Sequence, residues 1–189
     1  ALRPTLGAPL VGRSRELHEL TALWSSVKRE RRVALATVIA PAGVGKSRLL
    51  AEVAARLEGE ADVHWGRCLA YGEGITYWPV IEIVKDAAGI KSSDEREVVS
   101  AKLGELLECL PTSDTDTLRA IASTLANLLG APTTPRGTYV TEAITQNELH
   151  WGIRTLFELV AQQRPQLLVL EDLHWAEPTL LELLSFVLA

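Results

Sequence analysis

Eight consecutive residues, Ala-Pro-Ala-Gly-Val-Gly-Lys-Ser at residues 40–47, carry the pattern of a phosphate-binding loop. The pattern is met at every defined position except the first, where Ala40 replaces glycine. In such a loop, backbone N–H groups and the N-terminus of the following helix surround a phosphate. Lys46 would neutralise phosphate oxygens, and the Ser47 hydroxyl would bind Mg²⁺. The residue types therefore predict binding of a nucleoside triphosphate with Mg²⁺.

Seven residues of this stretch are expected to contact the nucleotide: Ala42, Gly43, Val44, Gly45, Lys46, Ser47 and Arg48. The two glycines would let the backbone approach the phosphates without a Cβ clash. A dinucleotide-binding fold fits less well, because Arg48 stands where its third glycine would be. The alternative interpretation is a surface turn with a solvated lysine.

Two adjacent carboxylates, Glu171 and Asp172, follow the apolar run at residues 167–170. In open α/β sheets, ligands bind at the carboxyl ends of the strands. We expect Glu171 to bind Mg²⁺ and Asp172 to polarise the attacking water, with Lys46 completing the catalytic set. The opposite assignment of the two acids stays open, as does a role for the pair in capping the following helix.

The elements that must position these groups alternate along the chain. Residues 33–39 are almost entirely apolar, which is typical of a parallel strand covered on both faces. A helical apolar stripe follows at 46–58, then further strands at about 62–69 and at 167–170. This order predicts a P-loop NTPase fold, a three-layer α-β-α sandwich around a parallel sheet.

Residues 78–164 are expected to form a mainly helical insertion between the second and third strands. Residues that would start or cap helices are Ser14, Pro79, Ser92 with Glu95, Ser113, and Thr145 with Glu148. Gly130 would end one of these helices. The stretch 131–137 is rich in proline and threonine and predicts a surface loop.

The composition is that of a soluble globular chain: 189 residues, 47% of them hydrophobic, with a net charge of −5. The acidic balance disfavours direct nucleic-acid binding, and no apolar run is long enough to cross a membrane. We expect a cytoplasmic protein. Because the chain has no Met and stops inside an apolar helical pattern, we expect one domain, residues 1–189, truncated at its C-terminus and part of a larger protein.

Three further stretches carry a family resemblance. Residues 10–17, residues 67–79 and residues 168–176 resemble the nucleotide-binding domain of the STAND class of AAA+-related ATPases. The most similar branch is found in bacterial proteins that join this domain to adenylate or guanylate cyclase domains, or to LuxR-type DNA-binding domains. The resemblance implies that Val11, Gly12 and Arg13 line the adenine pocket. It also identifies the glycine loop and the acidic pair as Walker A and Walker B motifs.

In that family, ATP binding and slow hydrolysis to ADP and phosphate form a switch in signal transduction or transcription regulation. The resemblance implies ATP and Mg²⁺ as cofactors, covalently linked output and repeat domains as partners, and a homo-oligomer as one possible assembly. Three alternatives stay open: a non-hydrolysing nucleotide-binding module for protein assembly, a P-loop kinase, and an initiator-type ATPase that grips DNA.

Overall fold

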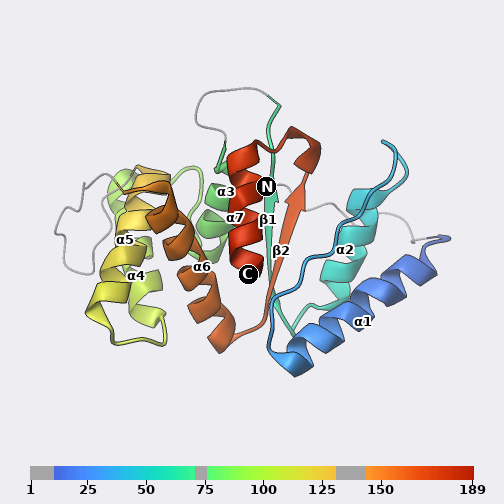
Figure 1. The fold of residues 1–189 in the computed structure, drawn as a ribbon, viewed down its shortest axis with the longest axis horizontal. Helices are drawn as coiled ribbons and strands as arrows, with labels where there is room; N and C mark the ends of the chain where they lie inside the picture. Colours follow the sequence, from blue (N-terminus) through green and yellow to red (C-terminus); the bar gives the residue numbers. More distant parts are fainter. Residues whose placement is uncertain (1–10, 71–75, 131–143) are drawn as a thin grey trace.

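The computed structural model describes residues 11–70, 76–130 and 144–189 (Figure 1). Helix α1 (Ser14–Glu30) leads through residues 33–39 into helix α2 (Lys46–Arg56). Strand β1 (Asp62–Arg67) and strand β2 (Gln166–Glu171) are separated along the chain by helices. The remaining elements are α3 (Trp78–Ala87), α4 (Arg96–Cys109), α5 (Thr115–Leu129), α6 (Gln146–Gln163), the 3₁₀ turn η1 (Leu173–Trp175) and α7 (Pro178–Leu188). Helices α3 to α6 occupy the place where an insertion was expected.

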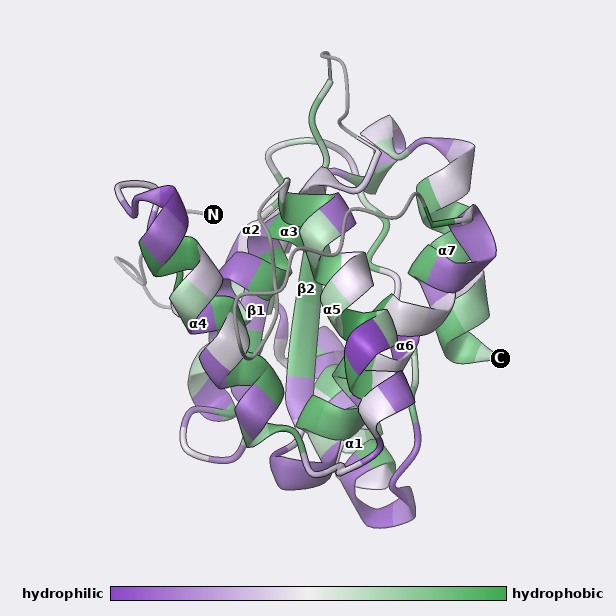
Figure 2. Cartoon of the chain, turned by 90° about the vertical axis from the view of Figure 1, so that its left-hand side faces the viewer, coloured by the Kyte–Doolittle hydropathy of each residue, from purple (hydrophilic) through white to green (hydrophobic). Residues whose placement is uncertain are grey.

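The two strands pair in parallel, in a register that runs from Asp62 opposite Gln166 to Arg67 opposite Glu171. Helices cover both faces of this small sheet. On one face, Ala51 of α2 packs with Trp65 and Val169. The other face lies against α3 and the helices beyond it. In Figure 2, β2 is hydrophobic along most of its length, whereas the helices carry polar residues outward.

The strand predicted at residues 33–39 is wrong for the described structure. The segment carries no strand assignment, and Val33, Leu35 and Ile39 are 51%, 52% and 88% exposed. Its chain is anchored by Val38, which packs against the apolar cluster between α1 and α2. The physical reason is that a strand needs a hydrogen-bonded neighbour. Within the described ranges, β1 and β2 pair only with each other, so residues 33–39 have no strand to pair with. The three-layer sandwich with this third strand stays a prediction.

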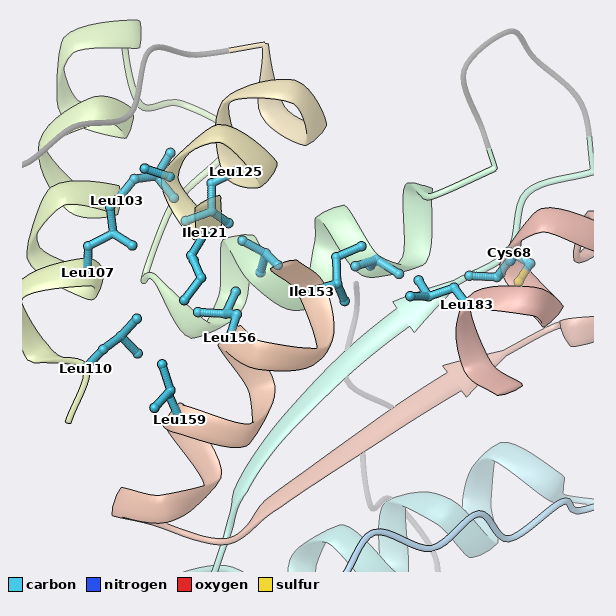
Figure 3. Packing of buried hydrophobic residues seen from close by; sticks show 14 residues of the cluster. Cys68, Leu103, Leu107, Leu110, Ile121, Leu125, Ile153, Leu156, Leu159 and Leu183 are labelled. Atoms are coloured by element: carbon cyan, nitrogen blue, oxygen red, sulfur yellow. The ribbon is translucent and has the colours of Figure 1, made fainter. Parts of the chain in front are cut away.

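The largest apolar core lies among the helices rather than against α2 (Figure 3). Leu103 and Leu107 of α4 face Ile121 of α5, and Ile153 and Leu156 of α6 pack beside them. All five side chains are at most 2% exposed. The helical part therefore has a core of its own, and it extends to Cys68 and Leu183 near the strand ends.

Several predicted helix ends are confirmed. Thr145 and Glu148 form the reciprocal capping box at the start of α6. Gly130 follows α5 with φ of 61°, the left-handed conformation that favours glycine. Pro79 lies in the first turn of α3, as expected. These signals are local, so the sequence carries them without help from the fold.

Two predicted caps are wrong, and one start is displaced. Ser14 is already helical, and its neighbour Arg13 is the N-cap. The box expected at Ser92 and Glu95 does not form, because Asp94 closes a turn by accepting a hydrogen bond from the Lys91 backbone N–H, at 2.8 Å. Helix α5 is capped by the Asp114 carboxylate, one residue after Ser113. The surface loop predicted at 131–137 lies outside the described residues.

Candidate functional site

The glycine loop before α2 exposes a row of backbone donors. Within the described chain, no hydrogen bond uses the backbone N–H groups of residues 42–45. Gly43 and Gly45 have φ of 79° and 90°, and a Cβ at either would meet no atom closer than 4.0 Å. Glycine is therefore needed here for its left-handed backbone, which turns successive N–H groups toward one side. Unpaired backbone N–H groups at a helix N-terminus are the kind of donor that anions bind.

Lys46, the first residue of α2, folds back over this loop. Its Nζ donates to the carbonyl oxygens of Ala40 and Pro41, at 2.8 and 2.9 Å. An ammonium group carries three N–H donors. Two of them are satisfied by the loop itself, and the positive charge is held beside the N–H groups of residues 42–45. These two hydrogen bonds hold the Lys46 ammonium group against the glycine loop.

The N-terminal stretch at residues 10–17 contacts the glycine loop through Arg13, one of the three residues expected at the adenine pocket. Arg13 donates from Nη2 to the Val44 carbonyl oxygen at 3.3 Å, and from Nη1 to Glu16 Oε1 at 2.6 Å. The Arg13 guanidinium lowers the pKa of the Glu16 carboxyl, chiefly through this hydrogen bond. Val11 is 83% exposed, and Gly12 has φ of 75°.

Arg13 and Glu16 also line a hollow of about 100 Å³ beside the loop. The other lining residues are Val38, Ile39, Ala40, Gly45, Lys46 and Leu49. Ligand pockets usually enclose roughly 300 to 1,000 Å³, so this hollow is smaller than a nucleoside would need. The geometry brings Arg13 to the phosphate loop but leaves Val11 and Gly12 outside the lining.

The acidic pair stands at the carboxyl end of β2, as predicted. Glu171 is the last residue of the strand and only 7% exposed, whereas the Asp172 side chain is 49% exposed. Asp172 has φ of 58°, an uncommon left-handed conformation for a residue that is not glycine. The chain therefore turns sharply between the two acids, and the two carboxylates differ in their access to water.

Arg67 is the residue that sequence reasoning missed as part of the site. Its Nη2 donates to Glu171 Oε2 at 3.0 Å, and its Nε lies 3.6 Å from Asp172 Oδ2. The hydrogen bond to Glu171, followed by the charge of that carboxylate, raises the pKa of the guanidinium above its ordinary value. The signal that could have revealed it is the strand register, because Arg67 stands opposite Glu171 at the ends of β1 and β2.

A family profile described as AAA ATPase domain matches residues 9–189. This chain belongs to the AAA ATPase domain family. No curated protein and no solved structure gives a significant match to it. Membership makes the chain a nucleotide-binding domain of the P-loop α/β class, and ATP with Mg²⁺ is what such domains bind.

The donor groups of this AAA ATPase domain fit a magnesium nucleotide. Mg²⁺ prefers hard oxygen ligands and is commonly held by one or two carboxylates together with substrate phosphates and water. Glu171 and Asp172 supply carboxylates, and exposed Ser47 supplies a hydroxyl at the start of α2. In the described ranges, no group of three or more His, Cys, Asp or Glu could hold a metal without a nucleotide. A cation here would depend on the phosphates for its remaining ligands.

The glycine loop and the acidic pair lie at the same end of the AAA ATPase domain, without a direct polar contact between them within the described residues. In Figure 1, the loop that precedes α2 and the carboxyl end of β2 both reach the upper edge. No hydrogen bond or ion pair in the described chain joins Lys46 or Ser47 to Glu171 or Asp172. Arg48 lies 3.8 Å from Glu52 on its own helix. Bound phosphates would have to bridge the gap.

Within residues 11–70, 76–130 and 144–189, no helix of this AAA ATPase domain combines the length and the hydropathy needed to span a bilayer. Part of the 67–79 stretch that carried the resemblance, residues 71–75, lies outside the described chain, as does residue 10 of the N-terminal stretch.

Proposed function

We propose that this domain binds Mg–ATP through its glycine loop and hydrolyses it slowly, so that the nucleotide state acts as a regulatory switch. Ala42 to Arg48 would surround the phosphates, with Lys46 neutralising their charge. Ser47 and Glu171 would hold the metal, and Asp172 would orient the attacking water. Arg13, with Val11 and Gly12 before it, would lie toward the adenine.

One observation carries the proposal. Four consecutive backbone N–H groups, at residues 42–45, lack partners within the described chain beside a lysine charge. Such groups bind anions readily, because the helix dipole and the N–H donors act together. The buried carboxylate of Glu171 at the same end of the molecule supplies the oxygen that a phosphate-bound Mg²⁺ requires.

The switch role rests on the STAND-class resemblance described above. We propose that ATP and ADP favour different arrangements of the domain and that linked output and repeat domains respond to them. A cyclase domain or a LuxR-type DNA-binding domain would be the output, in a cytoplasmic bacterial protein. Assembly into a homo-oligomer would be controlled by the same nucleotide state.

Calorimetry with Mg–ATP tests the site directly. We expect the Lys46→Ala variant to lose at least tenfold in affinity, because the phosphate charge is no longer compensated. Lys28→Ala is the matched control, since Lys28 is a half-exposed lysine that pairs with Glu60 on the surface. Equal affinities for wild type and Lys46→Ala would refute the assignment of the phosphate site.

A second candidate is a nucleotide-binding module that does not hydrolyse ATP. The observation in its favour is that Arg67 is hydrogen-bonded to Glu171 and lies within ion-pair distance of Asp172, so both carboxylates already have a positive partner on the chain. Phosphate release by wild type and by Asp172→Asn separates the two. Turnover lost in the variant supports the ATPase, whereas no turnover above background in either protein, with ATP affinity intact, supports the module.

A further inference from the structure

We propose that Arg67 is a built-in counter-cation for the acidic pair, which Mg²⁺ must displace before Glu171 can bind it. Arg67 would thereby set the Mg²⁺ concentration at which the site fills. The inference deepens the proposed function and rests on it for the identity of the metal site. It assigns Arg67 a positioning role, acting on the two carboxylates rather than on the nucleotide.

The geometry shows one guanidinium shared by two acids. Nη2 of Arg67 bonds to Glu171 at 3.0 Å while Nε faces Asp172 at 3.6 Å. Among the described residues, no other Lys, Arg or His lies within ion-pair distance of either carboxylate. The planar fork of arginine suits such a shared contact. The positive charge that the acidic pair needs is therefore already present on the chain.

Burial makes this contact more than a surface ion pair. The Glu171 side chain is 6% exposed, and a carboxylate so far from water must keep a positive partner. Arg67 supplies that partner until a metal takes over. Mg²⁺ and the guanidinium would repel each other at the same two carboxylates, because both are cations and Mg²⁺ binds carboxylate oxygen at roughly 2.0 to 2.1 Å. Metal entry and release of the arginine are therefore coupled.

The Arg67 side chain is also free to move away from the acidic pair. Its side chain is 48% exposed, so the guanidinium can turn into water at modest cost. Its backbone stays fixed meanwhile, because the Arg67 N–H donates to Glu82 Oε2 of α3 at 2.8 Å. The side chain can thus exchange partners without disturbing the end of β1.

The sheet offers a matched control at its other end. Arg164 lies 3.3 Å from Asp62, and the two side chains are 45% and 42% exposed. This arginine resembles Arg67 in exposure, but its carboxylate partner is open to water. Removing it changes the net charge by the same amount, far from the acidic pair.

The test is a Mn²⁺ titration of the chain in excess over a non-hydrolysable ATP analogue, with free Mn²⁺ followed by electron paramagnetic resonance, because the phosphates supply the remaining ligands of the cation. We expect Arg67→Gln to lower the Mn²⁺ midpoint at least fivefold, while Arg164→Gln leaves it unchanged. Arg67→Lys keeps one charge but loses the fork, so its midpoint falls between those of wild type and Arg67→Gln. Thermal unfolding establishes that each variant is folded, and if Arg67→Gln is not, Arg67→Lys decides.

An unchanged or raised midpoint in the deciding Arg67 variant would overturn the proposal. An equal drop in Arg164→Gln would overturn it too, because the effect would then come from net charge alone. Failure of the proposed function is seen separately, as absence of Mg–ATP binding by wild type in calorimetry. Where wild type does bind Mg–ATP, the comparison of Mn²⁺ midpoints decides the role of Arg67 independently of turnover.

Discussion

Gly66 is the residue at which a single methyl group should do the most damage to the sheet. A Cβ built there lies 2.2 Å from the Pro79 carbonyl oxygen and 2.8 Å from its carbonyl carbon. The obstacle is backbone, so no side-chain rotation can relieve it, and α3 must move away from β1. Pro79, Val80, Ile83 and Val84 of α3 are all buried and would move with it.

The magnitude follows from two opposing effects. Overpacking costs roughly 1 to 3 kcal/mol, and a backbone obstacle favours the upper end, about 3 kcal/mol. Replacing glycine by alanine inside a strand returns roughly 0.5 to 1 kcal/mol. Gly66→Ala should therefore lower the free energy of unfolding by about 2 kcal/mol. For a chain of 189 residues, that corresponds to a melting temperature about 4 to 8 °C lower.

Gly152 provides the control, because its obstacle is a side chain. A Cβ at Gly152 would lie 2.0 Å from the Thr124 hydroxyl oxygen, where α6 crosses α5. Gly152→Ala should be destabilising too, but the added substitution Thr124→Ala should restore part of the loss, because it removes the hydroxyl and leaves only the residue-124 Cβ, 2.8 Å away. The assay is thermal unfolding followed by circular dichroism. A Gly66→Ala protein as stable as wild type would refute the reasoning, and so would failure of Thr124→Ala to rescue Gly152→Ala.

Two further predictions concern stability. Burial lowers the pKa of His150 from its ordinary 6.5, so the unfolded chain takes up the proton first as the pH falls. The stability that neutral His150 contributes is complete above pH 6.5 and is lost below it, as the pH falls through the lowered folded-state pKa. The midpoint of unfolding in guanidinium chloride should therefore change less between pH 7.5 and 5.5 for His150→Gln than for wild type. Parallel pH profiles of the two midpoints would contradict this. Thr145→Ala removes the capping box of α6 and should cost about 1 kcal/mol, measured by the same unfolding, with an unchanged midpoint as the contrary result.

Local chemistry and the two parallel strands, β1 and β2, were predictable from the sequence, whereas the absence of a strand at residues 33–39 was not. The Thr145 box, the Gly130 cap and the left-handed glycines of the loop follow from residue type at a helix end or turn. The missing ladder at residues 33–39 could not be foreseen, because an apolar run shows that a strand is possible but not which strand lies beside it. The cap expected at Ser92 failed because Asp94, two residues later, competed for the same turn.

The residues of the candidate site show the same difference between local and long-range features. Lys46, Glu171 and Asp172 were predicted as site residues from motif spacing, which is a property of short segments. Arg67 was not found, since an arginine at the end of a strand becomes significant only when the register places it opposite an acid 104 residues away. Residues that act across a sheet need the topology before their role can be inferred.

The uneven distribution of the apolar core has a consequence for how the domain opens. Fourteen buried residues hold the helical part together, whereas the clusters around α1, α2 and the sheet contain six and three. Regions with few buried contacts open first and exchange their amide hydrogens fastest. The glycine loop belongs to the part with fewer buried residues. A ligand bound there would therefore stabilise a segment whose own local stability is low. Under the proposed switch function, occupancy of the loop would increase local order, and a linked domain would sense that order without contacting the ligand.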